Sequence, residues 1–168
     1  NFNVSAILIS FIFSILSSII LFELALIDFN KRIGILSVWF LNIFPTSFFL
    51  QAGYTESLFL TLTLFSVYLY RKKVYLLSGL YGLLSSVTRI NGLILIPFYF
   101  FEEFHNKFSK KSIMPLLVVS LLTLIGFSIY LFVNYLKFGE FFYFIAPLAE
   151  HWYKTFKFPW IGIKSLID

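Results

Sequence analysis

The stretch that decides the fold of this chain is VSAILISFIFSILSSIILF, at Val4 to Phe22, which contains no charged residue. A second uncharged stretch, IMPLLVVSLLTLIGFSIYLFVNYL, occupies Ile113 to Leu136. A helix needs roughly 20 apolar residues to cross the hydrocarbon layer of a bilayer, which is about 30 Å thick. Both stretches reach that length, so each predicts a helix that crosses a membrane.

The composition of the whole chain agrees with a membrane setting. Hydrophobic residues make up 60% of the 168 residues, charged residues make up 12%, and the mean hydropathy is +0.90, whereas soluble domains carry roughly 25% charged residues. The net charge of +5 comes from short basic clusters between apolar runs, a pattern that argues against a nucleic-acid partner. Cysteine is absent and histidine occurs twice. Because phosphate-loop, zinc-protease and dinucleotide motifs are also absent, the sequence predicts neither a metal site nor a cofactor.

Six hydrophobic segments follow one another along the chain. They predict an all-α, polytopic transmembrane bundle over residues 1–136, followed by an extracytoplasmic, aromatic-rich loop over residues 137–168. Pro45 is expected to kink or break the second segment, because proline removes a backbone hydrogen bond. Since the sequence begins without Met, we expect a fragment of a longer protein. The segments are Val4–Ile27, Ile33–Leu50, Ser57–Tyr70, Val74–Val87, Leu93–Phe101 and Ile113–Leu136.

Basic residues gather in every second break between these segments. The positive-inside rule assigns that side to the cytoplasm, so the breaks at 53–56 and 88–92 and the loop after Leu136 are predicted on the extracytoplasmic side. The fourth and fifth segments are each too short to cross the hydrocarbon layer. They form either two short helices or one long tilted helix, and the charge rule favours two. The basic residues are Lys31, Arg32, Arg71, Lys72, Lys73, Lys107, Lys110 and Lys111.

Arg89 is the most informative single residue of the sequence. A guanidinium at membrane depth costs about 3 kcal/mol on insertion scales and requires a polar cavity or a counter-charge. Asn91 and Gly92 beside it supply an amide and a flexible backbone. These residues indicate a site for an anionic group. The alternative is an arginine whose charge reaches out to lipid headgroups.

Glu56 is the second candidate, together with its neighbours Tyr54 and Ser57. The functional interpretation places an acid on the same outer side as Arg89, where it orients a polar substrate. The alternative is a helix start, with Thr55 as the cap residue and Glu56 favourably placed against the helix dipole.

The region after Leu136 combines aromatic with charged residues. Aromatic rings bordered by such groups suit a sugar, which stacks its apolar faces and hydrogen-bonds through its hydroxyls. The alternative is an aromatic belt at the membrane interface. The candidate substrate-binding residues are Glu140, His151, Trp152, Lys154 and Trp160.

The order of several motifs resembles the PIG-V family of mannosyltransferases. The resemblance implies a GT-C fold with short broken helices, in a multi-pass protein of the bacterial plasma membrane or the endoplasmic reticulum membrane. The motifs are NIFPTSFFLQAGYTES at Asn42–Ser57, TRING at Thr88–Gly92, FGEFFYF at Phe138–Phe144, HW at His151–Trp152 and PW at Pro159–Trp160.

The same resemblance implies an activity. A sugar, mannose or another hexose, would move from a polyprenyl-phosphate carrier to a glycan or glycolipid acceptor on the extracytoplasmic side, with membrane lipids around the protein. Arg89, with Asn91, would bind the carrier phosphate, and Glu56 would orient the donor or the acceptor. The resemblance implies that the catalytic base is an aspartate expected upstream of residue 1, so the fragment alone is expected to be inactive. Phe44 and Glu140 depart from the family pattern, which has asparagine and commonly aspartate there.

Two other classes of function stay open at this point. The broken segments at Pro45 and Arg89 would line the substrate pathway of a transporter or a lipid-linked sugar flippase, which inverted repeats would favour. If instead Arg89 and Glu56 face lipid headgroups, the chain is an assembly subunit without a site of its own.

Overall fold

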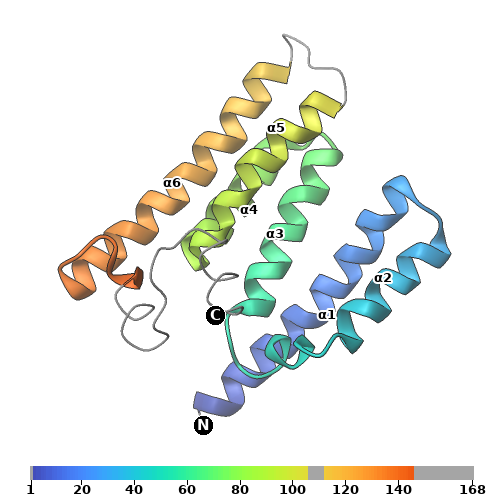
Figure 1. Cartoon of the computed structure of the whole chain (residues 1–168), viewed down its shortest axis with the longest axis horizontal. Coiled ribbons are helices and arrows are strands. Elements are labelled where there is room, and N and C mark those ends of the chain that lie inside the picture. The colour runs from blue at the N-terminus through green and yellow to red at the C-terminus, as the bar shows by residue number, and fades with distance from the viewer. Residues whose placement is uncertain (1, 106–111, 146–168) are drawn as a thin grey trace, which may run out of the picture. The chain divides into compact units, whose positions relative to one another are not determined.

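The computed structural model describes residues 2–105 and 112–145, and the regular structure of these two ranges is entirely helical (Figure 1). The all-α prediction is therefore confirmed. The elements are α1 (Phe2–Asp28), α2 (Lys31–Ile43), η1 (Ser47–Leu50), α3 (Glu56–Arg71), α4 (Tyr75–Thr88), η2 (Ile90–Ile94), α5 (Leu95–His105), α6 (Ile113–Phe138) and η4 (Tyr143–Ile145), where η denotes a 3₁₀ helix.

Two of the described helices, α1 and α6, are long and apolar enough to cross a membrane by length and composition. The other α-helices are shorter: α2 has 13 residues, α3 has 16, α4 has 14 and α5 has 11. At 1.5 Å per residue they reach about 17–24 Å, less than the hydrocarbon thickness of about 30 Å. The structure thus supports two membrane-crossing helices, and the full six-segment bundle stays a prediction.

The chain divides into two compact units, Asn1–Tyr130 and Leu131–Asp168. In the second unit, residues 131–145 are described. There α6 ends and Gly139 takes a left-handed conformation at φ 79°, which glycine adopts without steric cost. Two stacked ring pairs close this turn, Tyr135 with Phe141 and Phe138 with Tyr143, at centroid distances of 4.6 and 3.9 Å.

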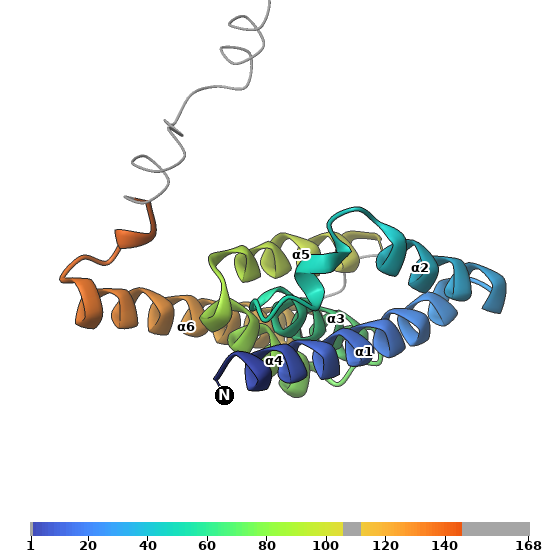
Figure 2. The same cartoon turned by 90° about the horizontal axis from the view of Figure 1, so that it is seen from below.

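Helix α3 lies between α1 and α4 in the first unit (Figures 1 and 2). It runs parallel to α1, because the Thr61 hydroxyl donates to the Phe13 carbonyl near one end while Arg71 pairs with Asp28 at the other. It runs antiparallel to α4, as two further contacts show. These contacts are Thr63 with Ser85 at 2.8 Å and the Ser66 hydroxyl donating to the Ser78 carbonyl at 2.7 Å.

Helix α5 turns back and runs parallel to α3. Ser66 contacts Tyr99 at 2.6 Å and Tyr70 donates to Glu103 at 2.7 Å. In both contacts the partner on α5 lies 33 positions further along the chain, so the two helices run in the same direction.

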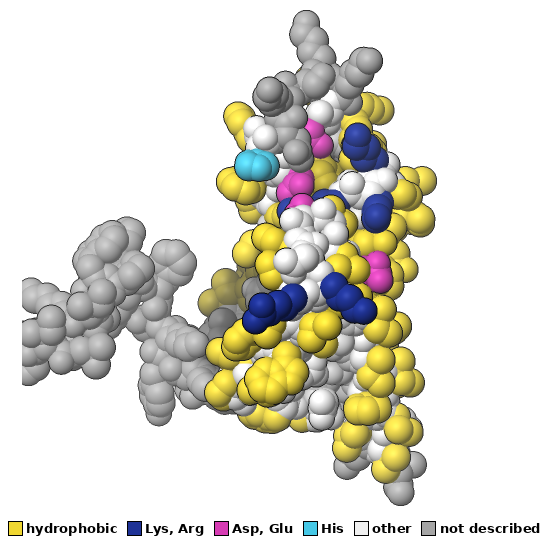
Figure 3. Space-filling model, turned by 90° about the vertical axis from the view of Figure 1, so that its right-hand side faces the viewer, with side chains coloured by type: hydrophobic (Ala, Val, Ile, Leu, Met, Phe, Trp, Pro, Cys, Tyr) yellow, Lys and Arg dark blue, Asp and Glu magenta, His cyan; other side chains and the backbone are white. Residues whose placement is uncertain are grey.

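The alternating directions of the helices bring the turns around residues 29–32 and 71–74 to one end of the first unit. Residues 44–55 and 89–94 lie at the other end. Basic and acidic side chains gather on the face seen in Figure 3. The predicted grouping of basic residues holds for these two turns, whereas Lys107, Lys110 and Lys111 lie outside the described residues.

The helix breaks refine the sequence predictions. The second segment was predicted to continue to Leu50, but α2 ends at Ile43, and Pro45 stands in a turn before η1. Proline thus breaks this helix rather than kinking it. Between α4 and α5, Arg89 is extended, with φ −150° and ψ 142°, so the region forms two helices and not one. Helix α5 continues to His105, past the predicted end at Phe101, and includes Glu102 and Glu103.

The interior of the first unit combines a small apolar cluster, formed by Tyr70, Leu95, Tyr99, Leu116 and Val119, with many small hydroxyl-bearing side chains. Many large apolar side chains on α1 and α6 point outward. The number of buried hydroxyl groups and of exposed large apolar side chains differs from the pattern of a water-soluble protein. In a membrane, small residues at helix interfaces let backbones approach closely and their hydroxyls bond between helices. The buried residues of this kind are Ser10, Ser14, Ser17, Ser57, Thr61, Ser66, Ser78, Ser85, Ser86 and Thr123.

Helix α6 packs closely against α4 at Gly126. A Cβ atom added there would lie 2.2 Å from the carbonyl oxygen of Leu83, which belongs to backbone and cannot rotate away. We expect Gly126→Ala to lower the free energy of unfolding by about 1–2 kcal/mol, because the two helices must separate. Thermal unfolding in detergent measures the change. Ser128→Ala, at an exposed position two residues further on, is the control and should stay within about 0.5 kcal/mol. Equal stability of the two variants would contradict the close packing.

Candidate functional site

Arg89 and Glu56 form an ion pair at the end of the first unit that is remote from the basic turns. The Nη2 atom of Arg89 lies 3.0 Å from Oε1 of Glu56, and the two side chains are 38% and 27% exposed. The sequence predicted both residues on one side, and the structure brings them into contact. An arginine with a carboxylate partner is stabilised within the protein, but this exposure leaves part of the guanidinium accessible to a second anion.

The pair depends on how α4 ends. Residue Arg89 leaves the helix in an extended conformation while its N–H still bonds to the Ser85 carbonyl at 3.1 Å. The chain then closes a 3₁₀ turn, in which the Gly92 N–H donates to the Arg89 carbonyl at 3.0 Å. This turn holds the Arg89 backbone at the helix end, so that its side chain is directed to the start of α3.

Gly92 permits that turn to lie directly on α4. A Cβ at this position would come within 2.6 Å of the Cα and N atoms of Ser86. We expect Gly92→Ala to displace the turn and with it Arg89. Because the family resemblance implies that Arg89 binds the carrier phosphate, the affinity of the full-length protein for polyprenyl phosphate should then fall about tenfold, since one misplaced charged contact costs roughly 1.5 kcal/mol. Ile94→Ala, at an exposed position of the same turn, is the control. Unchanged affinity in Gly92→Ala would show that the turn does not position Arg89.

Glu56 is the first residue of α3, where its charge suits the helix dipole. Thr55 is the N-cap residue of this helix, as the alternative interpretation predicted, although its side chain makes no cap hydrogen bond with the described residues. Of the two carboxylate oxygens, Oε1 faces Arg89. The other, Oε2, is buried and has no hydrogen-bond partner among the described residues. A buried carboxylate oxygen of this kind is costly to leave without a donor.

The other candidates around the pair differ in exposure. Ser57 is fully buried, and its hydroxyl finds no partner in the part of the chain that the structure describes. Tyr54 is exposed; its carbonyl accepts from Ser10 at 3.0 Å and its ring lies 5.7 Å from that of Phe49. Asn91 is exposed in η2. Ser57 therefore lies below the protein surface, whereas Tyr54 and Asn91 are exposed and could contact a ligand.

A cavity of about 430 Å³ adjoins Glu56, between the end of α2, η1 and the start of α3. Sequence reasoning missed it, although the run of aromatic and hydroxyl residues around Pro45 was a usable signal. Three phenyl rings and two leucines line it together with two hydroxyl groups and the carboxylate. The lining residues are Phe40, Leu41, Phe44, Thr46, Ser47, Phe49, Leu50 and Glu56.

The predicted candidates beyond residue 130 belong to the second unit. Glu140 is exposed there and stands just before the turn that leads into η4. The predicted residues His151, Trp152, Lys154 and Trp160 lie outside the described residues. The structure therefore brings together Arg89 and Glu56 of the predicted set, and the roles of the other residues stay predictions.

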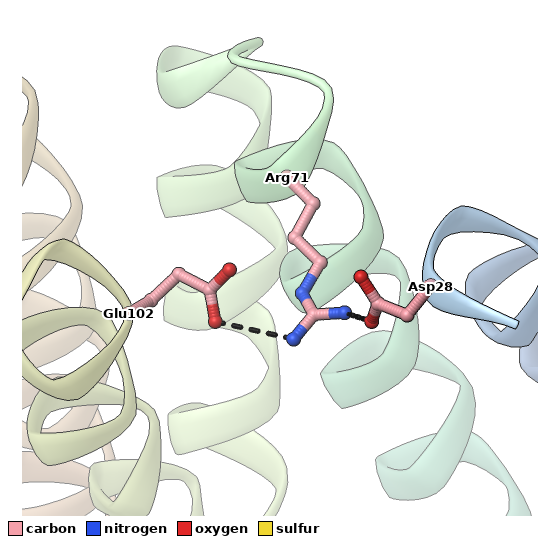
Figure 4. Close-up of polar contacts among 3 residues, drawn as sticks. All are labelled: Asp28, Arg71 and Glu102. Carbon is pink, nitrogen blue, oxygen red and sulfur yellow. Dashed lines mark hydrogen bonds and ion pairs between the residues drawn. The ribbon is translucent and has the colours of Figure 1, made fainter. Parts of the chain in front are cut away.

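A second charged cluster, which the sequence did not reveal, lies at the basic end. Arg71 at the end of α3 pairs with Asp28 of α1 and with Glu102 of α5, the latter at 3.2 Å (Figure 4). Next to it, Tyr70 donates to the buried carboxylate of Glu103 at 2.7 Å. These contacts join three helices at one end of the first unit.

Comparison with known proteins adds the family. Over 127 residues the chain is 33% identical to GPI mannosyltransferase 2 of Yarrowia lipolytica, covering 73% of this chain and 33% of that protein. Over 134 residues it is 28% identical to GPI mannosyltransferase 2 of Candida albicans, covering 66% of this chain and 33% of that protein. The chain is a relative of these mannosyltransferases. The resemblance that the motifs predicted is thereby confirmed.

The chain spans about a third of the length of these mannosyltransferase relatives. No protein-family model and no solved structure gives a significant match to it. The relationship thus rests on sequence similarity alone, and the helical arrangement described above is a separate observation. Neither relative's name refers to a particular residue, so the roles of Arg89 and Glu56 have to be argued from their chemistry.

Proposed function

We propose that this chain is part of a multi-pass membrane mannosyltransferase of the GT-C type. It would move mannose or another hexose from a polyprenyl-phosphate carrier to a glycan or glycolipid acceptor on the extracytoplasmic side. The observation that carries the proposal is the similarity to two proteins named GPI mannosyltransferase 2. The accessible ion pair between Arg89 and Glu56 supports it, because a fixed cation stabilises the charge that develops on a phosphate leaving group.

In this proposal, residues 1–136 form the membrane domain and residues 137–168 an extracytoplasmic loop. Helices α1 and α6 cross the bilayer, and the shorter α3 and α4 carry buried hydroxyl-bearing residues of the kind that pack membrane helices together. The basic turns face the cytoplasm under the positive-inside rule. The end that carries Arg89 then faces the opposite side, in a bacterial plasma membrane or an endoplasmic reticulum membrane.

The proposed chemistry is an inverting transfer. A base, expected to be an aspartate upstream of residue 1, removes the proton of the acceptor hydroxyl. The hydroxyl oxygen attacks the anomeric carbon, the bond from that carbon to the phosphate oxygen breaks, and polyprenyl phosphate leaves. Arg89, assisted by Asn91, binds this phosphate and stabilises its growing charge. A guanidinium has five N–H donors, so Arg89 can serve a phosphate while it keeps its contact with Glu56.

The remaining predicted residues take supporting roles in this proposal. Tyr54, Glu56 and Ser57 would contact substrate around the start of α3, and the extracytoplasmic loop would add further contacts. Aromatic rings next to charged groups suit sugars for the reasons given above. The residues of the loop are Glu140, His151, Trp152, Lys154 and Trp160.

A sugar-transfer assay in liposomes distinguishes a mannosyltransferase from a transporter or flippase. The full-length protein is placed in liposomes with radiolabelled polyprenyl-phosphate mannose and a glycolipid acceptor, and labelled acceptor is expected. A sugar nucleotide supplied as donor should give none. If the labelled donor instead crosses the bilayer without forming product, the protein is a flippase and the proposal fails. The names of the relatives do not favour that alternative.

A further inference from the structure

An apolar groove of about 410 Å³ lies between α1 and α2. Phe22 of α1 and the side chains of Val38 and Trp39 on α2 supply most of its surface. Its polar lining consists of Ser18 and Asn42, which a hydrogen bond of 3.2 Å joins across the two helices. The volume falls in the range of small-molecule sites, roughly 300–1,000 Å³. A ligand for this groove needs an apolar segment.

Two cations stand at one end of the same side of α2. Residues four and seven positions apart share one face of a helix, so Lys31 lies in line with Ile35 and Arg32 in line with Trp39, both of which line the groove. One helical turn, about 6 Å, separates Lys31 from Ile35, within reach of a long side chain. Both cations are exposed, and the groove therefore leads toward two accessible positive charges.

These two charges have no counter-charge among the described residues. Helix α1 carries two acids near this end, Glu23 and Asp28, but Asp28 pairs with Arg71, and neither acid forms an ion pair with Lys31 or Arg32. The first turn of α2 contains no acid, and cations there are unfavourable for the helix because its dipole is positive at that end. A bound anion would thus be stabilised without breaking an existing pair.

The combination of an apolar groove with adjacent cations matches a phospholipid, in which an acyl chain is joined to an anionic headgroup. The turn at 29–32 belongs to the basic end of the first unit, which the positive-inside rule assigns to the cytoplasm. The cytoplasmic leaflet is also where anionic phospholipids attract basic segments near the membrane. The polyprenyl-phosphate donor is a poorer match, because its phosphate is proposed to bind Arg89, at the opposite end.

We infer that the groove between α1 and α2 binds one acyl chain of an anionic phospholipid, whose phosphate pairs with Lys31 and Arg32. This lipid site goes beyond the sugar transfer proposed above and does not depend on it. The two cations select the charge of the headgroup, while the groove holds the chain. Selection by charge and occupation of the groove are then separable by mutation.

Quenching of Trp39 measures occupation of the groove, because this side chain lines it and is 60% exposed. The full-length protein is reconstituted in phosphatidylcholine vesicles with increasing amounts of phosphatidylserine or phosphatidylcholine that carries bromine on one acyl chain. Bromine quenches tryptophan on contact, and the difference between wild type and Trp39→Phe isolates the signal of Trp39. We expect phosphatidylserine to reach half-maximal quenching at an about tenfold lower mole fraction than phosphatidylcholine.

A pair of double variants tests the role of the charges. Lys31→Gln with Arg32→Gln should bring the two lipids to equal quenching. The matched control is Lys72→Gln with Lys73→Gln, which removes the same charge from exposed positions at the same end that do not line the groove. The control should keep the preference for phosphatidylserine. Equal loss in both double variants would mean that the surface charge of this end acts without a site, and would overturn the inference.

A second pair of variants tests the groove. Val38→Phe fills part of it and should reduce quenching by both brominated lipids severalfold. Leu36→Phe, an equal change at an exposed position of α2 outside the lining, should leave the quenching unchanged. Should Val38→Phe fail to fold, the charge variants decide.

Two further results would remove the phospholipid site. The first is equal quenching of wild-type Trp39 by phosphatidylserine and phosphatidylcholine. The second is loss of the quenching when polyprenyl phosphate is added in an amount equal to the brominated lipid, since the lipid carrier would then be the occupant. None of these measurements includes a sugar donor, so their outcome is separate from that of the transfer assay.

Discussion

Replacing Arg89 by alanine is expected to reduce mannosyl transfer by the full-length protein about a thousandfold, the loss typical of removing a group that stabilises charge in a transition state. The cation sits at 3.0 Å from Glu56 with 38% of its side chain exposed, so it can meet a phosphate as charge builds on the leaving oxygen. Arg89→Lys should lose most of this activity too, because an ammonium cannot offer the planar pair of donors that a phosphate accepts. Initial rates with labelled donor provide the measurement.

A charge swap separates this catalytic role from a structural one. In the double variant Arg89→Glu with Glu56→Arg, the ion pair is restored in reverse, and thermal stability should return toward the wild-type value. Transfer should not return, because the phosphate would now meet a carboxylate at position 89. Wild-type rates in the swapped protein would mean that the pair only holds α3 to the end of α4, and the phosphate role of Arg89 would be lost.

Arg71→Ala is expected to produce the largest loss of stability, about 3 kcal/mol in the free energy of unfolding. Arg71 is 23% exposed and pairs with Asp28 and Glu102 from two other helices (Figure 4). Removing it takes away the cation that Asp28 and Glu102 share, and breaking a partly buried pair costs more than the pair itself contributes. The estimate stands at the lower end of the usual 3–5 kcal/mol because Asp28 is 45% exposed to solvent.

Unfolding in detergent, followed by the fluorescence of the aromatic residues, measures this loss. Lys72→Ala, at the next and exposed position, is the matched control, and surface changes of that kind stay within about 0.5 kcal/mol. Arg71→Lys should fall between the two, because one ammonium cannot bridge both acids with the same geometry. A loss in Arg71→Ala no greater than that in Lys72→Ala would show that this cluster does not hold α1, α3 and α5 together.

The two ion-pair clusters stand at opposite ends of α3. Glu56 opens this helix and Arg71 closes it, so each charge lies where it suits the helix dipole. The partners come from α4 at one end and from α1 and α5 at the other. The central helix is thereby tied to three neighbours by charges, while between its ends it contacts them through hydroxyl groups such as those of Thr61, Thr63 and Ser66.

Local chemistry was enough to predict most helices and their breaks. The long apolar runs specify α1 and α6, because no other conformation satisfies their backbone in an apolar setting. Pro45 cannot continue a helix, and the polar residues at 88–92 interrupt the run that becomes α4 and α5. The predicted end of α5, at Phe101, was four residues too early, because the charged residues that follow were taken to mark the end of the apolar segment. In the structure Glu102 and Glu103 belong to the helix, where they contact Arg71 and Tyr70.

What the sequence determined by itself was the all-helical class, the order of the helices and the two runs long enough to cross a membrane, and it singled out Arg89 and Glu56 as candidate site residues. The tertiary structure decided which charges meet: Arg89 with Glu56, and Arg71 with Asp28 and Glu102, across separations along the chain of 33, 43 and 31 positions. It also decided that η1 encloses a cavity against α2 and α3. The physical reason is that helix formation depends on neighbours within about four residues, whereas an ion pair or a cavity depends on how helices from distant parts of the chain pack.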